Sequence, residues 1–154
     1  MPSDTSGSRN PPSAMRLIFE YEGDNVRLVS QQPVNVAVAG ADPARQQYPG
    51  YYIDSRNAAG ASLARVRAHD AFSGSVEVFP EPGRPGDTIT RVDVARPRGA
   101  FTVIVPVPTD ADRVTVVRVS PAATDTITTT HTVRSDAADA IATDIATFPL
   151  QINR

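Results

Sequence analysis

The chain has 154 residues, which is long enough for one domain with a buried core. Its net charge of −2 gives no electrostatic basis for binding nucleic acid or an anionic membrane. The lack of Cys excludes disulfides, thiolate metal sites and a Cys nucleophile, and the lack of Lys excludes Schiff-base chemistry.

The first 14 residues are rich in Ser, Pro, Gly and Asn, which predicts a flexible arm. They contain no apolar run that would act as a secretory signal, and no later stretch approaches 18 uninterrupted apolar residues. We therefore expect no membrane span. The cytoplasm is the default compartment, and an extracellular or particle-associated location stays open.

From residue 15 onward, the apolar residues are mainly Val, Ala and Ile in short runs between turns rich in Gly and Pro. This pattern predicts one all-β domain over residues 15–152, an antiparallel β-sandwich of immunoglobulin-like type. The strands expected before residue 100 span 16–21, 26–30, 51–56, 62–69, 75–79 and 88–95, and the stretch 34–39 either extends the strand 26–30 or forms a separate strand. Pro33 falls between these two segments, which predicts a bulge or a switch between sheets.

The strongest structural signal is the stretch 101–119, in which two β-branched runs flank a turn at 108–112. The pattern predicts a β-hairpin. Because neither strand has a cleanly polar face, we expect this hairpin to lie inside the sheet and not at an edge. Asp110 and Asp112 suit the turn, since short carboxylates bond nearby backbone N–H groups; Ca²⁺ binding by the pair is the weaker interpretation.

After Ser120 the composition changes, because residues 121–147 are rich in Thr, Ala and Asp and contain few large apolar side chains. This composition predicts a loop-rich excursion before a terminal strand at 146–152. Two alternatives stay open within it. One is a short helix at 136–145, with Ile141 and Ile145 on one side, and the other is a strand at 126–133.

Few residues could carry catalysis. His69 and Asp70 are adjacent, so on a strand they would point to opposite faces and could not act as a pair. His131 has no carboxylate nearby in sequence, and no spacing supports a site shared by the two His residues. Arg96 and Arg98 could form a small anion-binding spot, although a solvated loop is the commoner explanation. We expect no enzyme, no catalytic residue, no metal site and no cofactor.

Five residues are candidates for binding. Tyr48, Tyr51 and Tyr52 border the loop at 40–50 and could form an exposed cluster for contact with a protein or a sugar. Burial of at least one Tyr is expected from the strand period. Arg65 and Arg67 share a parity on the strand 62–69, which predicts a solvated face on an edge strand.

Two segments, YYIDSRNAAGASLARV and FTVIVPVPTDADRVTVVRV, have the pattern of strands joined by an Asn/Gly turn and by a Pro-x-Pro turn. Together they resemble the β-sandwich module that precedes the catalytic domain in some bacterial zinc peptidases. More loosely, they are similar to other immunoglobulin- or transthyretin-like accessory modules. The resemblance covers about residues 50–119. It implies a non-catalytic accessory role and transfers no catalytic residue to this chain.

The leading hypothesis is a non-enzymatic module for protein–protein interaction or self-assembly, because an edge strand offers unpaired backbone to a partner segment. The arm 1–14 and the excursion 121–147 are candidate docked or swapped segments. The alternative is a module that binds a carbohydrate or other small ligand through Tyr48, Tyr51 and Tyr52. An unfamiliar hydrolase is the third and weakest hypothesis.

Overall fold

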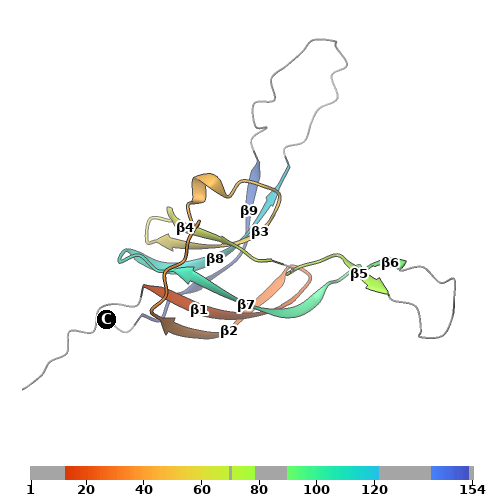
Figure 1. Cartoon of the computed structure of the whole chain (residues 1–154), viewed down its shortest axis with the longest axis horizontal. Helices are drawn as coiled ribbons and strands as arrows, with labels where there is room; N and C mark the ends of the chain where they lie inside the picture. The colour runs from red at the N-terminus through yellow and green to blue at the C-terminus, as the bar shows by residue number, and fades with distance from the viewer. Residues whose placement is uncertain (1–12, 70, 79–89, 122–139, 153–154) are drawn as a thin grey trace, which may run out of the picture.

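The computed structural model describes residues 13–69, 71–78, 90–121 and 140–152 (Figure 1). Within these ranges the chain forms nine β-strands and one short 3-10 helix, η1 (Pro43–Arg45). Two antiparallel sheets form a β-sandwich, which confirms the predicted all-β class. No helix in the described part of the chain is both long enough and apolar enough to cross a membrane.

The smaller sheet has three strands in the order β2-β1-β7. β1 (Ala14–Glu22) lies between β2 (Asn25–Val34) and β7 (Arg98–Pro106). Gly23, at a φ of 59°, forms the tight turn from β1 to β2, a conformation that Gly adopts at no steric cost. Pro33 lies on β2, which is an edge strand, and pairs with Met15 on β1. A missing backbone N–H is tolerated on an edge strand.

The larger sheet has four strands in the order β4-β3-β8-β9. These strands are β3 (Gly50–Asn57), β4 (Ser62–Arg67), β8 (Ala111–Ser120) and β9 (Ile141–Pro149). β4 lies at the edge, as the sequence predicts, and β8 lies inside the sheet. A separate antiparallel ribbon of β5 (Ser75–Val78) and β6 (Thr90–Asp93) extends away from the sandwich (Figure 1).

The core lies between the two sheets and draws on both. The buried apolar side chains of this cluster are Met15, Leu17, Phe19, Ile53, Phe72, Val103, Val105, Val107, Ala111, Val114 and Val116. On β1 and β7 these positions follow the two-residue period of a strand, with one parity facing inward.

Phe72 fills one part of this core from the segment that follows β4. Its ring lies 4.3 Å from the ring of Tyr51, 4.4 Å from that of Tyr21 and 5.6 Å from that of Phe101. Its backbone has a φ of 60°, which is rare for a bulky residue and is maintained where the surrounding packing demands it. The segment after β4 thus contributes a buried aromatic side chain that connects both sheets.

The hairpin predicted at 101–119 is wrong, because β7 and β8 belong to different sheets. β7 pairs with β1, and β8 pairs with β3 and β9. Pro106 and Pro108 donate no backbone hydrogen bond, whereas the Val107 N–H donates to the Ser13 carbonyl at 3.0 Å and extends the pairing with β1. The chain then crosses to the other sheet. The internal position is right for β8 but wrong for β7, which is an edge strand.

Other boundaries also differ from the prediction. β2 continues through Pro33 to Val34, and residues 35–38 form no strand. The terminal strand begins at Ile141 and ends at Pro149, so a helix over 141–145 is wrong. Residues 1–12 of the predicted arm at 1–14 lie outside the described residues, whereas Ala14 already belongs to β1. The predicted strand at 126–133, Asp70 and His131 also lie outside the described residues.

Candidate functional site

The four-stranded sheet carries an unusual set of polar side chains on the face that points away from the core. Along β3, Ile53 faces the core, so its neighbours Tyr52 and Asp54 face outward. Asp54 pairs with Arg65 on β4 and with Thr115 on β8, so all three side chains lie on this outer face. This outer face is the candidate site.

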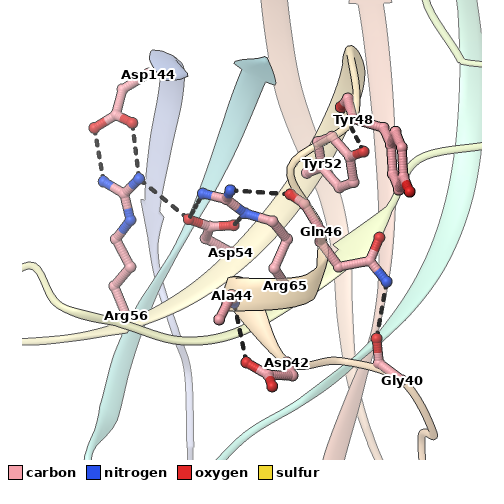
Figure 2. A network of polar contacts seen from close by, with 10 residues as sticks. All are labelled: Gly40, Asp42, Ala44, Gln46, Tyr48, Tyr52, Asp54, Arg56, Arg65 and Asp144. Atoms are coloured by element: carbon pink, nitrogen blue, oxygen red, sulfur yellow. Dashed lines mark hydrogen bonds and ion pairs between the residues drawn. The ribbon is translucent and has the colours of Figure 1, made fainter. Parts of the chain in front are cut away.

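Asp54 is the centre of the polar network in Figure 2 and is completely buried. The Arg65 guanidinium donates from Nε to Oδ1 at 2.6 Å and from Nη2 to Oδ2 at 2.8 Å. Arg56 donates from Nη2 to Oδ2 of the same carboxylate at 3.2 Å. Two cations thus compensate one buried anion, and the paired hydrogen bonds to Arg65 have the planar geometry that Arg favours.

Arg56 extends this network to β9. Its Nη1 and Nη2 donate to the two carboxylate oxygens of Asp144 at 2.7 and 2.8 Å. The hydrogen bond from Arg56 lowers the pKa of Asp144 below its ordinary value, and partial burial opposes the shift. The hydrogen bond to Asp144 likewise raises the pKa of Arg56, and that to Asp54 raises the pKa of Arg65.

The loop at 40–48 lies over the same face and is held there by polar contacts (Figure 2). The Arg65 backbone N–H donates to the Ala41 carbonyl at 2.8 Å, and its Nη1 donates to the Gln46 carbonyl at 3.3 Å. The Tyr52 hydroxyl donates to the Tyr48 carbonyl at 2.7 Å. Arg65 therefore donates hydrogen bonds both to the buried carboxylate and to the loop.

Asp42 begins η1 by accepting from the Ala44 N–H at 3.0 Å, as an N-cap residue does. Gln46 closes the loop by donating from Nε2 to the Gly40 carbonyl at 2.9 Å. This network thus pairs the carboxylates of Asp54 and Asp144 with Arg side chains, and the buried Nε of Arg56 has no hydrogen-bond partner among the described residues. The network is an internal brace and offers no free carboxylate for chemistry on a substrate.

The structure separates the five predicted binding residues. Tyr48 is 73% exposed, whereas Tyr52 is buried under the loop, so the predicted exposed Tyr cluster is wrong. Tyr51 faces inward and stacks on Phe72, as the alternation along β3 requires. Arg65 is 9% exposed, so the prediction of a solvated Arg row is also wrong for this residue.

Arg67 behaves as the sequence predicts, because it is exposed at the end of β4. Its guanidinium lies over Gly50, where a Cβ would approach Nη2 to 3.3 Å. Arg65 differs because the register places it opposite Asp54 and the loop at 40–48 covers it. Local alternation does not reveal either of those two partners.

The turn carboxylates are the candidate ligands that the sequence suggests for a metal ion. Asp112 pairs with Arg113, whose Nε lies 2.9 Å from Oδ1. In the described part of the chain, no group of three His, Cys, Asp or Glu residues is placed to hold a metal ion.

Arg98 lines a shallow depression of about 570 Å³ at one end of the three-stranded sheet, beside Tyr21. Glu20, Glu22 and Arg27 also line it, and Arg27 forms an ion pair with Glu20. The depression therefore carries charges of both signs, which does not favour anion binding at Arg98, the weaker of the two interpretations.

The first half of β9 is an exposed surface that the sequence does not predict, since the terminal strand was expected to begin at residue 146. Residues Ile141 to Asp144 are exposed, and Ile141 is 57% exposed despite its apolar side chain. The second half of β9 is joined to β2, because Gln31 donates from Nε2 to the Pro149 carbonyl at 2.9 Å. Only the first half of this edge is left without a neighbouring strand among the described residues.

In comparisons with known proteins, no family model, no curated protein and no solved structure matches this chain.

Proposed function

We propose that this chain is a non-enzymatic β-sandwich module for protein–protein interaction or self-assembly, as accessory modules of immunoglobulin-like type are. The observation that carries the proposal is the exposed first half of β9, with Ile141 at its start. An edge strand with free backbone groups and an exposed apolar side chain is suited to pair with an added strand.

The other three edges support the first half of β9 as the contact, because each is obstructed or blunted, whereas the bulge in β9 lies at Ile145, after this half. β2 carries a bulge between Leu28 and Ser30 and also contains Pro33. The middle of β4 is occupied, since the Arg65 N–H already donates to Ala41. β7 lies beside β4 at the side of the sandwich. Bulges, prolines and covering loops are the ways in which natural sheets prevent pairing at an edge.

Carbohydrate or small-ligand binding is the second candidate function. It would depend on Tyr48, which alone of the three Tyr residues presents most of its side chain to solvent. A single exposed ring provides less contact area than a cluster. A glycan array with the wild-type chain and the Tyr48→Ala variant tests this function, and a signal that is lost in the variant would favour it over the interaction module.

Two measurements test the interaction module. Sedimentation equilibrium over a wide range of protein concentration should show association that Ile141→Lys weakens, because a charge would then lie in the contact. In addition, a photo-crosslinking amino acid at position 141 should capture a protein in the native host, whereas the same group at the exposed position 102 should not. A monomer at all concentrations, together with no adduct at position 141, would refute the proposal.

A further inference from the structure

The alternating direction of the backbone hydrogen bonds in the four-stranded sheet determines which groups of β9 point away from β8. This side of β9 is called its free side. In an antiparallel sheet, the N–H and C=O of one residue point to the same neighbouring strand, and this direction alternates along the strand. The Tyr51 carbonyl accepts from the Ala68 N–H at 2.9 Å, so Tyr51 bonds toward β4 and Tyr52 toward β8. Tyr52 pairs with Val117, and the next residue, Arg118, therefore bonds toward β9.

Arg118 pairs with Thr143, so the backbone of Thr143 bonds to β8. Its two neighbours, Ala142 and Asp144, consequently direct their N–H and C=O groups to the free side of β9. These groups are arranged symmetrically about Thr143. Ile141, which is 57% exposed, precedes them on the same strand.

We propose that β9 pairs with β9 of a second copy of this chain, antiparallel, about a two-fold axis at Thr143. This inference rests on the proposed function and names its partner. Ala142 of each copy then lies opposite Asp144 of the other, and each of these pairs exchanges both of its N–H···O bonds. The four-stranded sheets of two copies become one continuous sheet, with the same surface used by both copies.

Side chains favour the axis at Thr143 over an axis at Asp144. An axis at Asp144 would place two carboxylates directly opposite each other, which is destabilising. With the axis at Thr143, each Asp144 faces Ala142 and keeps its own ion pair with Arg56 at 2.7 Å. The same register brings Ile141 next to Ile145 of the second copy, the half-buried residue at the bulge of β9, so an exposed apolar side chain gains an apolar neighbour.

A single cysteine tests the axis, and the chain has no Cys that would interfere. Thr143 would face its own copy as a pair without mutual hydrogen bonds, at a Cα–Cα distance of about 4.5 Å, which a disulfide can span. Under mild oxidation, Thr143→Cys should convert most of the chain to a covalent dimer. Thr102→Cys, on an exposed position of β7, should form no covalent dimer.

A proline provides the second test. Because the Ala142 N–H points to the free side, Ala142→Pro removes no hydrogen bond within the sandwich but removes one from each pair across the axis. We expect loss of the dimer with an unchanged circular dichroism spectrum. Ala142→Ser is the matched control and should keep the dimer.

The outcomes separate this inference from the function on which it rests. A covalent dimer with Thr143→Cys, together with dissociation by Ala142→Pro, supports the two-fold pairing. A wild-type chain that associates without either effect, a dimer cross-linked through position 102, or an adduct at position 141 with a different protein would overturn the pairing and leave the interaction module standing. A chain that neither associates nor forms an adduct would overturn both.

Discussion

At the scale of single residues, Asp54 is the position on which the outer face depends. Its carboxylate is fully buried and is the shared partner of Arg65 and Arg56, whose side chains are only 11% and 16% exposed. Asp54→Asn would leave buried guanidinium groups without this compensating charge. We expect a loss of about 3 kcal/mol in the free energy of unfolding, since breaking one side of a buried ion pair is strongly destabilising.

Urea denaturation measures this loss as a lower midpoint at an unchanged slope. Asp144→Asn is the control, because the Asp144 side chain is 53% exposed and exposed ion pairs contribute less than about 1 kcal/mol. Equal shifts for the two variants would show that the buried carboxylate is not the centre of the network.

The ion pair of Asp144 should also make the free energy of unfolding depend on pH. The Arg56 hydrogen bond depresses its pKa in the folded chain below the ordinary value of about 3.9 that it has when unfolded. Stability from this pair is therefore complete above about pH 4 and is lost as the pH falls through the depressed folded pKa. Below about pH 4, the free energy of unfolding should decline less steeply in Asp144→Asn than in the wild type. Parallel pH profiles would contradict this assignment.

At the scale of elements, β7 shows that a strand at the edge of a sheet can still carry buried core side chains. Val103 is 8% exposed in the core, although β7 is an edge strand. Val103→Asp should abolish soluble expression, because the carboxylate would be buried without a partner. Thr102→Asp is the matched control, since Thr102 is exposed on the opposite face of the same strand and should tolerate the charge. Soluble yield and an amide NMR spectrum compare them, and a well-folded Val103→Asp would refute its role in the core.

The strands show what the sequence can predict about this fold. Alternation and β-branched residues locate β1, β3 and β8 within a few residues, because these are local properties. Strand pairing is not a local property. The two runs at 101–119 do not pair with each other, because the first pairs with β1 and the second with β3. The Pro residues between them were a usable signal, since they prevent a tight hairpin from forming there.

The polar brace could not be predicted in the same way. Arg56 and Asp144 are 88 positions apart in the sequence, and no local period connects them. Arg65 and Arg67 share a parity, yet only Arg65 lies opposite a buried carboxylate and beneath a loop. The identity of a cross-strand neighbour, and not the pattern along one strand, decides whether a charged side chain is buried.

At the scale of the whole molecule, hydrogen bonds connect the two sheets at the C-terminal end of β9. Gln31 on β2 bonds the Pro149 carbonyl at 2.9 Å and accepts from the Gln151 N–H at 3.1 Å, which ties the two sheets together at that end. The other end of β9, from Ile141 to Asp144, extends past this connection. Assembly through that end would add contacts without disturbing the core.

Such assembly makes thermal stability depend on protein concentration. Pairing stabilises only folded chains, and a partner at about 100 times its Kd contributes about 2.7 kcal/mol. For a domain of this size each kcal/mol raises the Tm by about 2–4 °C, so the Tm should increase by several degrees across that concentration range. Ala142→Pro should keep one Tm at all concentrations, and that Tm should equal the wild-type value at high dilution. A wild-type Tm that does not change with concentration would mean that the edge of β9 is left unpaired in solution.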